Sequence, residues 1–152
     1  MSYWLLKSEA SCYSIDDMKR DKKVSWEGIR NYQARNFMRE MKVGDLCFFY
    51  HSSDKETGVY GVVKVVAEAH VDESQFKKSD EHFDPKATTE KPIWQCVDVA
   101  FVEKFKSPIS LSEIKHDPKL SGIVVAEQGS RLSVQPVSPT HFEHILQLAH
   151  KK

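Results

Sequence analysis

Apolar residues come in short runs along the chain, and most runs are bounded by polar or turn-forming residues. The run LCFFYH at 46–51 is continuous and aromatic, which is typical of a central strand, whereas GVYGVVKVVAEA at 58–69 alternates along a longer strand. A polar turn over 52–57 should close these two strands into an antiparallel hairpin. Further strands are predicted at 3–6, 24–26, 93–105, 123–125 and 132–134.

Helices are predicted where a hydroxyl or amide side chain precedes an amphipathic stretch. Ser14 and Asp17 resemble a capping box, and Asn31 is a suitable N-cap for a second helix whose inward face includes Met38. A Ser-Pro pair opens the last helix, because proline is well tolerated at the first helical position. The predicted helices cover 14–21, 32–41, one or two turns from 110, and 138–150.

The order of these elements indicates an α+β fold. Two helices follow the first strands, the remaining strands are grouped, and a helix ends the chain, which favours a mixed sheet curling into a small barrel over a doubly wound parallel sheet. A length of 152 residues fits one domain over 1–152. Residues 72–92 are charged and lack periodicity, and a loop of this length is usually functional or mobile.

Charge is balanced overall but unevenly distributed. The chain has 22 basic and 22 acidic residues. Between Lys19 and Lys42 eight Lys/Arg face three Asp/Glu, a balance of +5, whereas 68–90 holds three lysines and seven acids, a balance of −4. These segments are either two solvated faces of opposite sign or, for the first, a face that meets phosphates.

Composition also bears on metals and location. The three cysteines, Cys12, Cys47 and Cys96, are far apart, and no CxxC pair or zinc-finger histidine pair accompanies them, so we expect free thiols and neither a metal nor a cofactor. No stretch is apolar enough to span a bilayer, and the N-terminus does not read as a signal peptide. We therefore expect a cytoplasmic monomer without membrane contact.

Aromatic residues are the first candidates for ligand binding. Trp26 lies among polar neighbours and before a glycine, so we interpret it as a pocket wall, although a core position is the alternative. Phe49 and His51 share one face of their strand, and Phe49 is a candidate for either the pocket or the core. A wall of this kind suits a flipped base.

Polar groups at two strand ends are the second candidates. Lys7 and Ser8 end the first strand, and His51 and Ser52 end another, so their donors and acceptors are placed to meet in one pocket unless they are merely solvated. Glu9 faces the same side as Lys7 along an extended strand, where pairing would raise the pKa of the lysine.

The start of the second predicted helix is the candidate phosphate site. Arg30, Arg35 and Arg39 lie at or after a helix N-terminus, where anions bind well, and the last two share one helical face. Asn31 is either a plain cap or a ligand contact.

Three alternating polar residues near the end of the chain complete the candidates. Arg131, Ser133 and Gln135 fall on one face of a predicted strand, which either lines the pocket or faces solvent.

Several segments together resemble the EVE domain, a PUA-like fold related to YTH readers. The segments that carry the resemblance are YWLLKSE (3–9), YSIDD (13–17), WEGIRNYQARNFMREMKVGD (26–45), FFYHS (48–52), GVYGVV (58–63), DPK (84–86), VDVAFVEKF (97–105) and RLSVQPV (131–137). The resemblance implies a PUA-like mixed β pseudo-barrel flanked by short helices, with a pocket between the first strand, the Trp26 segment and the FFYHS strand. It also implies a reader of modified bases in DNA or RNA.

The first hypothesis is a non-enzymatic binding module that captures a modified base of a nucleic acid in an aromatic pocket. The alternative is a small amidohydrolase acting on modified nucleosides, as in ASCH-type relatives, with Lys7 as base, Ser8 as positioning hydroxyl and Glu9 as proton shuttle. A third hypothesis is an adaptor that binds a small molecule or a protein and no nucleic acid.

Overall fold

The structure, a computed structural model, describes residues 1–52, 56–128 and 131–152. Six strands form one sheet in the order β2-β5-β4-β3-β1-β6. In chain order the strands are β1 (Tyr3–Glu9), β2 (Lys23–Ser25), β3 (Leu46–Ser52), β4 (Gly58–Val71), β5 (Gln95–Ser110) and β6 (Val134–Val137). The helices are α1 (Ile15–Asp21), α2 (Tyr32–Glu40), α3 (Leu111–His116) and α4 (Pro139–Lys151), with 3-10 turns η1 (Glu73–Phe76), η2 (Pro118–Leu120) and η3 (Val124–Ala126).

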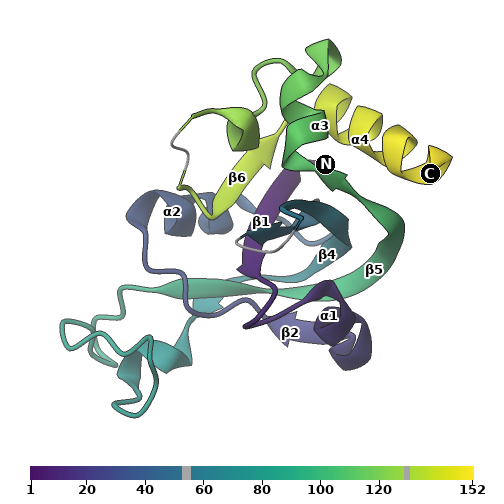
Figure 1. Ribbon diagram of the computed structural model, residues 1–152. Coiled ribbons are helices and arrows are strands. Elements are labelled where there is room, and N and C mark those ends of the chain that lie inside the picture. The colour runs from purple at the N-terminus through teal and green to yellow at the C-terminus, as the bar shows by residue number, and fades with distance from the viewer. Residues whose placement is uncertain (53–55, 129–130) are drawn as a thin grey trace.

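The sheet is mixed and strongly curled, but it is not closed. β1 pairs in parallel with β3, whereas the other pairings are antiparallel. Register shifts recur along the β4–β5 pair, and bulges of this kind bend strands, which matches the arc of β5 in Figure 1. The predicted α+β, PUA-like class is therefore confirmed, with an open sheet ending at β2 and β6.

Both faces of the central strands are buried, which explains their continuous apolar sequence. In β3, Phe49 points into a first core under α2, and Phe48 points into a second core under α4. Phe48 stacks on Phe142 of α4 with ring centroids 4.0 Å apart. The second core thus fixes α4 to the sheet, on the right in Figure 1.

The helix signals of the sequence are confirmed. Ser14 and Asp17 form the capping box of α1, and Asn31 accepts a hydrogen bond from the backbone N–H of Ala34 at the start of α2. A second capping box joins Ser110 to Glu113.

Three strand predictions are wrong in part. No strand forms at 123–125: Val124–Ala126 form the 3-10 turn η3, and a short buried apolar run does not distinguish strand from helix. β5 continues beyond Phe105 to Ser110, since Pro108 lies in an unpaired irregularity between Lys104 and Ile109, where no ladder N–H is required. β6 covers Val134–Val137 rather than 132–134. Part of the predicted turn at 52–57 lies outside the described residues.

Truncating the α4 anchor tests this packing. Phe142→Ala removes a ring that is 1% exposed and stacked on Phe48, so we expect a loss of about 3–5 kcal/mol in the free energy of unfolding. Urea unfolding measures the loss. Glu143→Ala, on the exposed side of the same helix, should change it by no more than about 0.5 kcal/mol. Equal losses for both variants would contradict the packing.

Candidate modified-base cleft

A cleft of about 580 Å³ opens beside Trp26, and we call it the Trp26 cleft. Its volume lies within the range of small-molecule sites. The lining comes from the end of β1, the turn after it, the segment that leaves β2, the loop between β4 and β5, and the residue before β6. The lining residues are 7–9, Cys12, Tyr13, 24–30, Glu81, His82 and Ser133.

Trp26 is both a wall of this cleft and a member of the first core. Only 8% of its surface is exposed. Its ring packs edge-on against the rings of Phe49 and Tyr13, with centroid distances of 5.5 Å and 6.5 Å. Its backbone N–H donates to the carbonyl of Val97 at 2.8 Å, which continues the pairing of β2 with β5. The pocket and core interpretations of Trp26 are therefore not alternatives.

The FFYHS strand supports the cleft from behind instead of lining it, so the pocket boundary implied by the resemblance needs correction. Phe49 is fully buried behind Trp26. His51 accepts a hydrogen bond from the backbone N–H of Ile15 at 3.0 Å and stacks on Tyr60 at 3.8 Å. The hydroxyl of Ser52 lies 3.5 Å from the carbonyl of Ser8.

The end of β1 does reach the cleft. The Ser8 hydroxyl donates to the carbonyl of Tyr13 at 2.6 Å, which holds the turn after β1. The backbone N–H of Lys7 donates to the carbonyl of Ser133 at 2.9 Å, and this bond places both residues at the same border of the cleft. Burial lowers the pKa of Lys7, which is opposite to the rise expected from pairing with Glu9.

Arg131, Ser133 and Gln135 do not share one face as predicted, because β6 begins only at Val134. Ser133 lines the Trp26 cleft. Gln135 is 1% exposed and donates to the carbonyl of Leu132, away from the cleft lining. Arg131 and Asn31 border a separate groove between α2 and η3.

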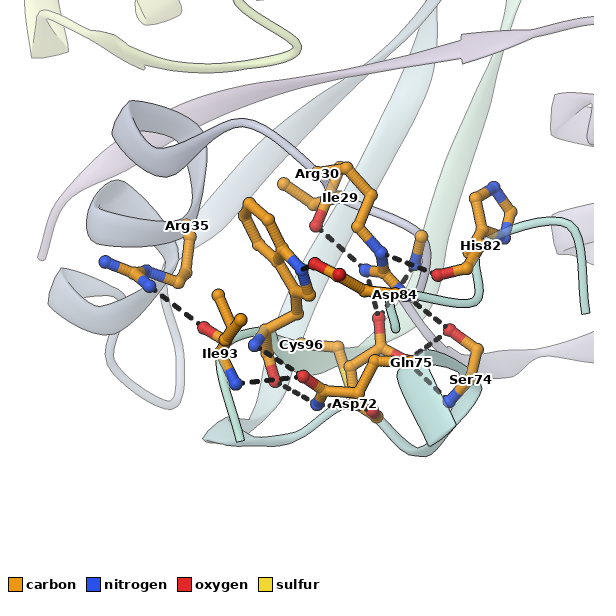
Figure 2. A network of polar contacts seen from close by, with 12 residues as sticks. Ile29, Arg30, Arg35, Asp72, Ser74, Gln75, His82, Asp84, Ile93 and Cys96 are labelled. Carbon is orange, nitrogen blue, oxygen red and sulfur yellow. Dashed lines mark hydrogen bonds and ion pairs between the residues drawn. The ribbon is translucent and has the colours of Figure 1, made fainter. Parts of the chain in front are cut away.

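A buried carboxylate, Asp72, joins the cleft wall to the long loop (Figure 2). Asp72 Oδ2 accepts hydrogen bonds from the backbone N–H of Gly28 at 2.9 Å and from Arg30 Nη1 at 3.1 Å. Asp72 Oδ1 accepts from the N–H and the hydroxyl of Ser74. Burial opposes its ionisation, but these bonds outweigh it, so the pKa of Asp72 lies below the usual carboxyl range.

Arg30 is held inside this network, as Figure 2 shows. Its guanidinium donates to the carbonyls of His82 and Ile29, each at 2.9 Å, and to Ser74 Oγ at 3.0 Å, besides Asp72. Most of its donors are thus used within the protein. Arg30 shapes the cleft, and its predicted contact with phosphate stays a prediction.

Gly28 lets the loop approach the cleft wall closely. Its φ is +89°, a conformation that L side chains rarely adopt, and an added Cβ would lie 2.8 Å from the His82 ring. The loop over 72–92 brings Glu81 and His82 to the cleft.

Gln75 and Asp84 hold the base of the same loop. Gln75 is fully buried; its amide donates to the carbonyls of Asp72 and Trp94 and accepts from two backbone N–H groups of 93–94. Asp84 accepts from the indole N–H of Trp94 at 2.8 Å.

Glu27 lines the cleft and Asp72 supports its wall, and neither is among the site residues predicted from the sequence. Burial, together with the charge of Asp72, raises the pKa of Glu27, whose side chain lines the cleft next to Trp26. Adjacency to Trp26 was an available signal for Glu27. Asp72 had none, because its partners Gly28 and Arg30 lie more than forty positions away in sequence.

The described residues contain no cluster of three or more metal-ligating side chains, and none of their helices is long and apolar enough to cross a membrane.

The remaining predicted residues, Arg35 and Arg39, lie outside the cleft on α2. Arg35 Nη1 donates to the carbonyl of Ile93 at 2.9 Å, and Arg39 donates to Gln95 Oε1.

Removing the buried carboxylate tests its role. Asp72→Ala leaves Arg30 without its anionic partner, and we expect a loss of about 3 kcal/mol in the free energy of unfolding at neutral pH. Because the folded-state pKa of Asp72 is depressed, this stability is present above the unfolded pKa of about 3.9 and is lost as pH falls through the folded value. Wild type and variant should therefore converge in acidic urea titrations.

Glu90→Ala, an exposed acid of the same loop, is the matched control and should change stability by no more than about 0.5 kcal/mol. A difference between wild type and Asp72→Ala that stays constant down to acidic pH would contradict a role for the charge.

Known proteins resemble this chain over nearly its whole length. The family model described as EVE domain matches residues 2–148. Thymocyte nuclear protein 1 from Homo sapiens is 40% identical over 171 residues, which cover 99% of this chain and 75% of the human protein. The curated protein from Danio rerio with the same name is 42% identical, with 97% and 71% covered.

Solved structures show the same relationship. A protein from Leishmania major superposes with a TM-score of 0.96 at 46% identity, with 99% of this chain and 96% of that chain covered. Human thymocyte nuclear protein 1, in complex with DNA containing 5-methylcytosine, superposes with a TM-score of 0.90 at 39% identity, with 100% and 99% covered. An ASCH protein from Zymomonas mobilis, at 8% identity and a TM-score of 0.55, shares the fold alone. The chain belongs to the EVE domain family.

Proposed function

We propose that this protein is a non-enzymatic binding module that takes a modified base of a nucleic acid into the Trp26 cleft. The observation that carries the proposal is the cleft itself, about 580 Å³ in volume and walled by an indole, in a chain that superposes on human thymocyte nuclear protein 1 bound to DNA with 5-methylcytosine. We take 5-methylcytosine as the first base to test.

The groups around the indole suit the edge of a base. The hydroxyl of Ser133 and the carboxyl of Glu27 line the cleft near Trp26, and a carboxyl accepts well from an exocyclic amino group such as that of cytosine. Burial and the charge of Asp72 raise the pKa of Glu27, which favours the protonated form, and a protonated carboxyl donates a hydrogen bond as well.

Replacing the indole tests the proposal. Trp26→Leu keeps the side chain apolar but removes the stacking surface, so affinity for 5-methyl-2′-deoxycytidine should fall by about 5- to 100-fold, or ~1–2.7 kcal/mol, as expected for one lost stack. Trp26→Phe should retain most of the affinity. Isothermal titration calorimetry, at a temperature where each variant is folded, gives the comparison.

The control separates binding from stability. Phe142→Leu also removes a buried ring, but it lies in the second core, so it should lose stability and keep affinity. An affinity that follows stability across all three variants would contradict a direct contact between Trp26 and the base.

One observation favours an enzyme as the second candidate. Burial lowers the pKa of Lys7, which increases the fraction of neutral amine available as a base. Lys7 Nζ lies 5.7 Å from the ring centroid of Tyr50, where a charged ammonium is also stabilised. This contact favours a charged Lys7, and hence binding without chemistry.

A product assay distinguishes the two candidates. Incubation of wild type with acylated or methylated nucleosides, followed by chromatography, should give no product above the protein-free blank. Lys7→Ala is the matched variant. Product formation by wild type that disappears in Lys7→Ala would overturn the binding module in favour of an amidohydrolase.

A further inference from the structure

The exposed face of α2 next to the Trp26 cleft carries an aromatic ring and two arginines. Tyr32, at the first position of α2, is 58% exposed. Positions 32, 35 and 39 follow the helical repeat, so Tyr32, Arg35 and Arg39 lie along one stripe. We call these three residues the α2 platform.

Stacked side chains connect this platform to the cleft. Arg30 lines the cleft, and its guanidinium carbon lies 5.5 Å from the ring centroid of Trp94. The Trp94 ring in turn packs against Tyr32, with ring centroids 4.9 Å apart. The guanidinium carbon of Arg35 lies 4.9 Å from the centroid of the Tyr32 ring. The platform is thus two side-chain contacts from the cleft wall, and Figure 2 shows Arg30 and Arg35 on neighbouring elements above the loop.

Among the described residues, no carboxylate forms an ion pair with the arginines of the platform. Arg20 and Arg30 pair with aspartates, whereas the hydrogen bonds of Arg35 and Arg39 to the described residues reach only neutral oxygens of Asn36, Ile93 and Gln95. Burial, and then the charge of Arg39, lowers the pKa of Arg35. An anion between the two side chains would relieve this repulsion.

An exposed ring beside two uncompensated guanidinium groups matches the chemistry of a nucleotide. Bases of any sequence stack on aromatic rings, and arginine binds phosphate through parallel N–H donors. An acidic peptide would use the arginines but leave the ring unused. The combination therefore favours a nucleic-acid strand over a protein partner.

We propose that the α2 platform binds the nucleotide next to the captured base in the same strand, with its base on Tyr32 and its phosphate between Arg35 and Arg39. This inference rests on the proposed function, because the strand is located by the base in the Trp26 cleft. It adds a second site of contact that recognises the polymer rather than the modification.

The test compares a free nucleoside with an oligonucleotide. Tyr32→Ala should leave the affinity for 5-methyl-2′-deoxycytidine within about twofold of wild type, but lower the affinity for a DNA strand with one central 5-methylcytosine by about 5- to 100-fold, as expected for one stacked base. Tyr32→Phe keeps the ring and should restore oligonucleotide binding. Calorimetry measures the nucleoside, and fluorescence anisotropy measures the strand.

The arginines are tested through salt. Arg39→Gln should reduce the slope of log affinity against log salt by roughly 0.7 for a single strand, the effect of one phosphate contact. Lys19→Gln, an exposed cation on α1, is the matched control and should leave the slope unchanged. An unchanged slope in Arg39→Gln would overturn the phosphate assignment.

The outcomes separate the two proposals. If wild type binds neither nucleoside nor strand, the proposed function fails. If wild type binds both and Tyr32→Ala loses neither, the proposed function stands and the platform is overturned. Equal losses for nucleoside and strand would also overturn it, because Tyr32 would then act by supporting the cleft through Trp94.

Discussion

The buried carboxylate of Asp72 is the constraint on which the Trp26 cleft depends. Its two oxygens accept from the backbone of Gly28, from Arg30 and from Ser74, so one side chain ties the segment after β2 to the loop after β4. A buried charge is tolerable only with such a full set of donors. Because Asp72 satisfies this requirement across forty residues of sequence, the loop and the wall carrying Trp26 take up one fixed arrangement.

The position of Trp26 follows from the same arrangement. Its indole packs edge-on against Phe49 within the first core, while the cleft is open along another part of its surface. A stacking wall must be rigid to contribute its full energy on binding, since any ordering on association is a cost. Core packing supplies that rigidity, so the burial of Trp26 supports its proposed role in binding.

Local signals account for the parts of the fold that the sequence predicts well. The caps at Ser14 and Asn31 and the aromatic run of β3 each depend on residues a few positions apart, and each is confirmed. The bonds of Asp72 to Gly28 and Arg30, and the pairing of Gln135 with Leu5 of β1, join distant segments, which no local pattern encodes. The 72–92 loop likewise has no periodic pattern that places it, although its residues Glu81 and His82 line the cleft.

The distribution of charge suggests how the proposed tasks are divided. Three glutamates line the cleft, whereas its cations are Lys7 and Arg30, and Arg30 is paired with Asp72. The balance of charge in the cleft is therefore negative and gives little attraction for phosphate. The uncompensated cations Arg35 and Arg39 lie instead on α2, beyond Trp94. A base is recognised best by placed donors and acceptors, and a phosphate by exposed positive charge. Separating the two lets the cleft discriminate among bases while the helix next to it supplies the salt-dependent part of the affinity.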